Sequence, residues 1–209
     1  MCGVIGILSH EQVNNATDAR RMVKTLHHRG PDDSGIWAGE SSGVALGHAR
    51  LSILDLSPAG HQPMVSQCGR YVISFNGEIY NHKSLRKEVE YLGANLRGHS
   101  DTEVMLACIS LWGVEKATKR FNGMFSFALW DQKDRIMFLV RDRLGEKPMY
   151  YGWMGDTFLF GSEIKALRQH PNWHGEIDRD VVALYLRHNY IPGPHSIFKN
   201  IFKLSFNIF

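Results

Sequence analysis

Pairs of short apolar runs with brief connections between them limit the fold of this chain more than any other feature. Runs 124–130 and 136–141 form one pair, and runs 149–153 and 157–160 form the other. Aromatic and β-branched residues, which favour strands, are frequent in these runs. Connections this short suffice for a β-hairpin, whereas a parallel crossover needs about a dozen residues or more. The two pairs therefore predict antiparallel hairpins.

The other patterns are grouped along the chain and do not alternate regularly. Further strand-like runs lie at 4–8, 35–38, 44–48 and 71–75. Helical patterns are expected from about Thr17, from Asn81 through Leu92, from the capping box Ser-Asp-Thr-Glu at 100–103, and after Ser162 and Asp178. This grouping predicts an α+β domain in which helices pack outside antiparallel sheets.

Composition fits a soluble domain that folds without disulfides or metals. The chain has 209 residues, of which 44% are hydrophobic and 22% charged. Its cysteines, Cys2, Cys68 and Cys108, are odd in number and lack metal-site spacing, so we expect no disulfide framework and no metal site. A reducing, cytoplasmic setting follows. The N-terminus has no signal-peptide pattern, and no run approaches the length of a membrane span.

Charge argues against a nucleic-acid partner. The net charge is +3 and the basic residues are dispersed, with the densest local group at 116–120 interpreted as a solvated helix face. We therefore expect that the chain binds neither nucleic acid nor membranes.

Cys2 directly follows Met1, and this placement has a chemical use. The side chain after Met1 is small, so removal of Met1 is expected to leave a thiol and a free α-amine on one residue. Such an amine can act as the general base for its own side chain. Both groups titrate near neutral pH, with reference pKa values of about 8 and about 8.5. Taken alone, the placement fits equally well a cysteine that merely begins the strand-like run 4–8.

Polar clusters interrupt the apolar pattern, and each has a plain structural interpretation. They are HRGPD at 28–32, GHARLSI at 47–53, FNGEIYN at 75–81 and HSD at 99–101. Asn76-Gly77 is a strong turn signal between a strand and a helix. Asp101 fits the positive end of a helix dipole, and Arg50 fits a surface charge. Arg29 and Asp32 are expected to order the loop over a pocket, and His48 and His99 to be structural.

Together, these clusters supply what a thiol needs to open a carboxamide. Thiolate attack creates an oxyanion that requires aimed donors. The Asn76 amide and the Gly77 N–H can supply two. Arg50 offers the fork that a carboxylate prefers, and Glu78 and Asp101 offer anions for an ammonium. The set matches the side-chain amide and the α-groups of glutamine.

Longer motifs extend over nearly the whole chain. They are MCGVIG at 1–6, RGPD at 29–32, RLSILD at 50–55, FNGEIYNH at 75–82, SDTE at 100–103, FNGMFSFALWD at 121–131, RDRLGEKPMYY at 141–151 and SEIKAL at 162–167. With them the chain resembles the N-terminal glutaminase domain of asparagine synthetase, a class II glutamine amidotransferase of the N-terminal-nucleophile hydrolase superfamily.

The resemblance implies a fold and a role for each site residue. The fold is a four-layer αββα sandwich of two antiparallel sheets flanked by helices. The catalytic residues are the nucleophile Cys2, with its freed amine as base, and the oxyanion-hole residues Asn76 and Gly77. The implied substrate-binding residues are Arg50, Leu51, Ser52, Ile53 and Leu54 for the α-carboxylate, Glu78 and Asp101 for the α-ammonium, and Asn76 and Gly77. The implied products are glutamate and ammonia, formed through a γ-glutamyl thioester.

The Pro-Gly-Pro sequence at 192–194 marks the expected domain boundary. The resemblance places a glutamine amidotransferase domain at 2–191, followed at 192–209 by a tail with exposed apolar side chains that leads toward an ATP-dependent synthetase domain. The Ser-Gly-Gly-x-Asp-Ser loop of such a domain does not occur in the sequence. The glutaminase domain is therefore expected to need no cofactor, and ATP and magnesium belong to the absent synthetase domain.

The implied function is glutamine hydrolysis that supplies ammonia for ATP-dependent asparagine synthesis. The expected partners are L-glutamine and a synthetase domain or subunit, and a homodimer is an allowed assembly. One alternative keeps the glutaminase but changes the acceptor to a polysaccharide sugar carboxylate or a β-lactam precursor. Another is a non-catalytic module that only binds glutamine.

Overall fold

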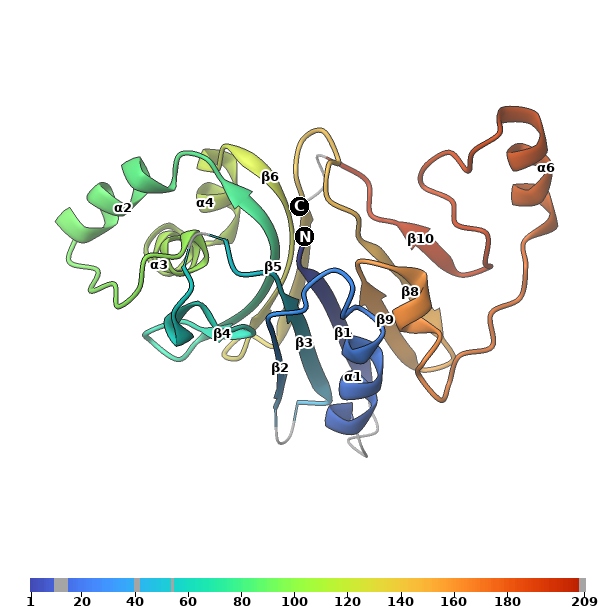
Figure 1. The fold of residues 1–209 in the computed structure, drawn as a ribbon, viewed down its shortest axis with the longest axis horizontal. Helices are drawn as coiled ribbons and strands as arrows, with labels where there is room; N and C mark the ends of the chain where they lie inside the picture. Colours follow the sequence, from blue (N-terminus) through green and yellow to red (C-terminus); the bar gives the residue numbers. More distant parts are fainter. Residues whose placement is uncertain (10–14, 40–41, 54, 207–209) are drawn as a thin grey trace.

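The computed structural model describes residues 1–9, 15–39, 42–53 and 55–206. Two antiparallel sheets pack face to face, and helices cover their outer faces (Figure 1). In the described residues, one sheet has the strand order β10-β8-β9-β1-β3-β2 and the other the order β4-β5-β6-β7. The predicted fold class, an αββα sandwich, is confirmed.

The larger sheet contains β1 (Gly3–Ser9), β2 (Asp33–Ala38), β3 (Val44–Arg50), β8 (Tyr150–Met154), β9 (Thr157–Gly161) and β10 (Ile201–Lys203). The smaller contains β4 (Met64–Val65), β5 (Tyr71–Ile79), β6 (Gly123–Asp131) and β7 (Ile136–Arg141). Helices α1 (Asn15–Lys24) and α5 (Ile164–Leu167) pack on the larger sheet. Helices α2 (His82–Tyr91), α3 (Asp101–Trp112) and α4 (Val114–Arg120) lie together on the side of the smaller sheet, and α6 (Arg179–His188) extends away from the sandwich (Figure 1).

Alternation along β1 explains how one strand serves two layers. Ile5 and Ile7 belong to the apolar cluster between the larger sheet and its helices. Val4 belongs to the cluster between the two sheets, against which Leu8 also packs. Successive side chains of a strand point to opposite faces, so a strand that is apolar at nearly every position is buried on both faces. β1 is therefore a central strand, and its first residue begins deep in the sandwich.

The predicted strands and helices are all present, with small corrections at their ends. Asp178 caps α6, because its carboxylate accepts the Asp180 and Val181 N–H groups. Ser100 caps α3 through the Glu103 N–H, but the Glu103 carboxylate accepts from Arg97 and Gly98, so the capping box is only half formed. Ser162 is not the cap of α5; its hydroxyl instead accepts the Val4 N–H.

The predicted turn at Asn76-Gly77 is wrong. Both residues lie inside β5, and Gly77 pairs with Phe125 of β6. A Cβ atom on Gly77 would lie 2.2 Å from the Met124 carbonyl oxygen. Glycine is required here for the close approach of two backbones, and this need produces the same dipeptide as a turn.

The expected exposed tail is also corrected in part. β10 pairs with β8, and Ile201 and Leu204 are buried. Phe202 and Phe206 are exposed. Residues 201–203 therefore form an edge strand of the larger sheet, and the domain boundary at 191/192 stays a prediction. Within the described residues, none of the helices has the length and apolarity to cross a membrane.

Candidate active site

Strand register brings Cys2 and Arg50 to the same end of the larger sheet. Gly3 pairs with Ala49 in the antiparallel ladder of β1 and β3, so the residue before β1 lies opposite the last residue of β3. Asn76 and Gly77 come from β5 of the other sheet, and Asp101 begins α3. Four elements thus meet where the two sheets adjoin.

The described site residues line one pocket with a volume of about 130 Å³. Those predicted from the sequence and found in its wall are Cys2, Arg50, Leu51, Ser52, Ile53, Asn76, Gly77, Glu78 and Asp101. Leu54 lies outside the described residues. Met1, Asp55, Gln62 and Lys147 also contribute to the wall. In the part of the chain that the structure describes, no group of three or more His, Cys, Asp or Glu side chains could hold a metal ion.

The Cys2 thiol is half-buried and touches the loop after β3. The Leu51 N–H donates to Sγ at 3.4 Å, and Sγ lies 3.7 Å from the Leu51 carbonyl oxygen. Burial raises the pKa of the thiol above its ordinary value, while the Leu51 contact and the N-terminal positive charge oppose that rise. The thiol is therefore mostly protonated until a base takes its proton.

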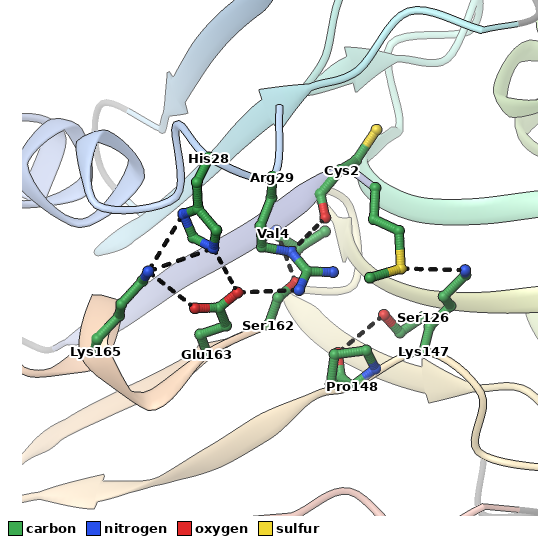
Figure 2. Close-up of polar contacts among 11 residues, drawn as sticks. Cys2, Val4, His28, Arg29, Ser126, Lys147, Pro148, Ser162, Glu163 and Lys165 are labelled. Atoms are coloured by element: carbon green, nitrogen blue, oxygen red, sulfur yellow. Dashed lines mark hydrogen bonds and ion pairs between the residues drawn. The ribbon is translucent and has the colours of Figure 1, made fainter. Parts of the chain in front are cut away.

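Arg29 fixes the backbone of Cys2 through a side-chain hydrogen bond. Its Nε donates to the Cys2 carbonyl oxygen at 2.9 Å, and its Nη1 pairs with the Glu163 carboxylate at 3.0 Å. Figure 2 shows Arg29 between Cys2 and Glu163, with His28 and Lys165 gathered around the same carboxylate. The RGPD and SEIKAL motifs therefore meet at the nucleophile. From the sequence we predicted that Arg29 orders a loop, and we predicted no role for Glu163.

Asn76 presents a donor with no partner. Its Nδ2 is buried and makes no hydrogen bond within the described residues, although the side chain is only 1% exposed. A buried amide without a partner is costly, and it is uncommon in folded proteins unless a ligand uses it. The Asn76 amide is thus available to a ligand oxygen in the pocket.

Arg50 is held by carbonyl oxygens. Its guanidinium donates to the Ser57 oxygen at 3.1 Å and to the Asp55 oxygen, and no carboxylate within the described residues forms an ion pair with it. Gly60 packs against the guanidinium, where a Cβ atom would lie 2.1 Å from Nη2. Arg50 therefore places a positive charge at the wall of the pocket without a direct carboxylate partner among the described residues. The sequence alternative of a surface charge is wrong, because Arg50 is buried.

Asp101 and Glu78 supply negative charge across the pocket. Asp101 is buried at the first turn of α3, and its Oδ2 accepts the Ile79 N–H at 3.0 Å. Burial raises the pKa of the Asp101 carboxyl, and the hydrogen bond from Ile79 opposes that rise. Glu78 is half-buried, and its carboxylate makes no hydrogen bond or ion pair among the described residues. Both can face a ligand ammonium.

Two further carboxylates fix the loop that follows Arg50. Asp32 accepts the Ser52 N–H at 2.8 Å, as expected for a residue that orders this loop. Asp55 is buried and accepts the Ser57 N–H at 2.8 Å and the His99 N–H at 2.9 Å. Asp55 closes the RLSILD motif, but its contact with the start of α3 was not predicted.

Asp55→Asn should destabilise the fold by about 1–3 kcal/mol at neutral pH, because one buried N–H donor loses its acceptor. Hydrogen bonds from Ser57 and His99 lower the pKa of Asp55 to about 2. Its stabilisation is therefore complete above the unfolded-state pKa of about 4 and is lost as the pH falls toward 2. Urea unfolding at pH 7 and pH 3 should show a smaller pH effect in the variant. Asp156→Asn, at an exposed turn, is the matched control. It should change neither the free energy of unfolding at pH 7 nor its difference between pH 7 and pH 3.

Comparison with known proteins agrees with this arrangement. A family profile described as "Glutamine amidotransferase domain" matches residues 1–208. A putative asparagine synthetase [glutamine-hydrolyzing] 2 of Methanocaldococcus jannaschii is 39% identical over 98% of this chain and 42% of its own length. Asparagine synthetase [glutamine-hydrolyzing] 3 of Bacillus subtilis is 43% identical over 86% of this chain and 29% of its own length.

Among solved structures, the glutamine phosphoribosylpyrophosphate amidotransferase from B. subtilis superposes with a TM-score of 0.68 and 25% identity. That match covers 80% of this chain and 43% of the other. The chain thus spans less than half the length of the relatives that it matches. On the family profile, the relatives and the shared sandwich, the chain belongs to the family of class II glutamine amidotransferase domains.

Proposed function

We propose that this domain hydrolyses L-glutamine to glutamate and ammonia, with Cys2 as the nucleophile. The observation that carries the proposal is the meeting, in one pocket, of a thiol, an unpaired buried amide donor, a guanidinium without a carboxylate partner among the described residues, and two carboxylates. A carboxamide with a carboxylate and an ammonium at its other end matches all of them. Glutamine is the amino acid with that spacing and belongs to the activity for which the family is named.

In the proposed mechanism, removal of Met1 frees the Cys2 amine. The amine takes the thiol proton, and the thiolate attacks the amide carbon of glutamine. The oxyanion accepts hydrogen bonds from Asn76 Nδ2 and the Gly77 N–H. The intermediate collapses, the protonated amine returns a proton to the leaving nitrogen, and ammonia departs. Water then hydrolyses the γ-glutamyl thioester, so that glutamate leaves and the thiol is restored.

The α-groups of glutamine are held at the far end of the pocket. Arg50 pairs with the α-carboxylate, assisted by the backbone from Leu51 to Leu54. Asp101 and Glu78 bind the α-ammonium. These contacts supply binding energy remote from the reacting amide, and they place its carbon against Sγ.

We further propose that the ammonia serves ATP-dependent asparagine synthesis by a synthetase domain or subunit. Support comes from relatives named as glutamine-hydrolysing asparagine synthetases, which extend well beyond the region matched here. In this proposal ATP and magnesium act only on the synthetase domain or subunit, and the glutaminase domain needs no cofactor.

We propose a cytoplasmic setting, supported by free cysteines, and no nucleic-acid partner, supported by dispersed charge. A homodimer is an allowed assembly, and analytical ultracentrifugation would measure the molar mass of the protein in solution.

The test is the release of glutamate and ammonium from glutamine by the purified chain, together with mass spectrometry of its N-terminus. We expect equal amounts of both products and a mass that lacks Met1. Glutamine binding by calorimetry without turnover would instead support a non-catalytic binding module. Turnover by a sample in which Met1 is fully retained would contradict the role of the free amine.

Arg50→Lys should raise the KM for glutamine by about 10- to 100-fold with a smaller change in kcat, since lysine keeps the charge but loses the bidentate fork. Initial rates over a range of glutamine concentrations measure both constants. Arg70→Lys is the matched control, because Arg70 forms a bidentate pair with Asp131, Nε to Oδ1 and Nη2 to Oδ2, away from the pocket. An unchanged KM in Arg50→Lys would contradict the assignment of the α-carboxylate.

A further inference from the structure

Two groups that hold opposite ends of glutamine in the proposed function come from different elements. Asn76 lies on β5, and Asp101 begins α3. A reacting carbon must be placed within about half an ångström of its productive position, so the separation of these elements must be fixed. The Asp101–Ile79 hydrogen bond joins α3 to the end of β5, three residues beyond Asn76. A second tie is needed on the other side of Asn76.

Gln62 provides that tie through one side chain. Its Oε1 accepts the Phe75 N–H at 2.7 Å, and its Nε2 donates to the Thr102 hydroxyl at 3.2 Å. Phe75 directly precedes Asn76, and Thr102 directly follows Asp101. Gln62 and Thr102 are 6% and 2% exposed, so water does not compete for these bonds. We propose that Gln62 is a positioning residue that sets the distance between the oxyanion donor and the ammonium-binding carboxylate.

The register of β4 explains why a side chain makes the first bond. β4 pairs antiparallel with β5, with Met64 opposite Ile73. The same register extended by two residues sets position 62 opposite Phe75, but β4 begins only at Met64. The Gln62 amide takes the N–H that a longer β4 would have bonded. A backbone carbonyl there would satisfy Phe75 but could not reach on to α3.

The other side of the Phe75 peptide is held as well. His48 Nε2 lies 2.9 Å from the Phe75 carbonyl oxygen. Complete burial lowers the pKa of His48 to about 4, so the ring is neutral near pH 7 and donates its Nε2 proton to this oxygen. Phe75 is thereby fixed at its carbonyl oxygen by His48 of β3 and at its N–H by Gln62. Both bonds fix the backbone that immediately precedes Asn76.

Other side chains of similar length would serve this position less well than glutamine. Methionine fills the same space but leaves the Phe75 N–H and the Thr102 hydroxyl without partners. Glutamate could bond both, yet it would add a negative charge beside Asp101 and oppose its ionisation. Gln62 contributes to the pocket wall, but it holds none of the reacting atoms in this mechanism, and the proposal is that it acts through Asn76 and Asp101.

The test compares two reagents that modify Cys2. Iodoacetamide is small and uses no α-groups, whereas 6-diazo-5-oxo-L-norleucine carries the α-groups of glutamine and alkylates a thiol with loss of N₂. In Gln62→Met we expect labelling by the diazo compound, and kcat/KM for glutamine, to fall by about 10- to 100-fold. Iodoacetamide labelling should stay within about twofold of the wild-type rate. Peptide mass spectrometry follows both reactions.

Thr102→Val cuts only the bond to α3 and tests the same tie in a milder variant. We expect the same selective loss, smaller in size, and little further loss when it is combined with Gln62→Met. Thr118→Val removes another buried threonine hydroxyl, bonded to Val114 within α4, and is the matched control for stability. Equal loss with both reagents, or wild-type rates in both variants, would overturn the positioning role. Failure of the wild-type protein to react with the diazo compound would contradict the proposed function itself.

Discussion

Cys2→Ala should abolish the release of glutamate from glutamine, with kcat lower by about four orders of magnitude or more. In the proposed mechanism the sulfur forms the covalent intermediate, and the pocket offers no second thiol within the described residues. Alanine is also small, so Met1 removal and the free α-amine should persist. The change therefore removes the sulfur and little else, and a coupled glutamate dehydrogenase assay measures the result.

A matched thiol controls for general effects of cysteine replacement. Cys68 is exposed and contacts Ser66 and Ser110 at a distance from the pocket, so Cys68→Ala should leave kcat within about twofold of the wild-type value. Both alanine variants should unfold at nearly the wild-type temperature. A Cys2→Ala rate within tenfold of the wild type would show that the sulfur is not the nucleophile.

Local patterns predicted most of the fold because they depend on near neighbours. The apolar run of β1 and the close spacing of β6 with β7 are visible in the sequence itself. The short strand β4 was missed, because a strand of two residues is defined by its partner across the sheet rather than by its own composition. The Asn76-Gly77 dipeptide was misread for a related reason: the constraint on Gly77 comes from β6.

The candidate site likewise contains residues that the sequence could predict and residues that it could not. Residues whose chemistry faces the ligand, such as Arg50 and Asp101, are polar interruptions that a sequence displays. Residues that hold those groups make bonds across the fold: Asp55 reaches His99, 44 positions away, and Gln62 reaches Thr102, 40 positions away. Nothing in a linear pattern joins such pairs, and their role becomes apparent only when β5, α3 and the loop after β3 are seen together.

Asn76 is the site residue whose structural cost is easiest to separate from its chemistry. Its Nδ2 is buried without a partner among the described residues, so the folded protein gains no hydrogen bond from it. An unpaired donor in this place is useful only when negative charge develops on a ligand oxygen. The proposed oxyanion is such a charge, and it appears in the transition state and not in bound glutamine.

Asn76→Ala should therefore lower kcat by about 10²–10³-fold and change the KM for glutamine by less than about threefold. Steady-state rates measure kcat and KM, and thermal unfolding of the same samples measures stability. Ser126 of β6 pairs directly with Asn76 across the strands, and its hydroxyl already bonds the Pro148 carbonyl oxygen. Ser126→Ala should thus lose stability but keep kcat within about twofold, the reverse of Asn76→Ala. If Asn76→Ala instead raised KM while kcat stayed constant, its amide would contribute to ground-state binding and the oxyanion would require another donor.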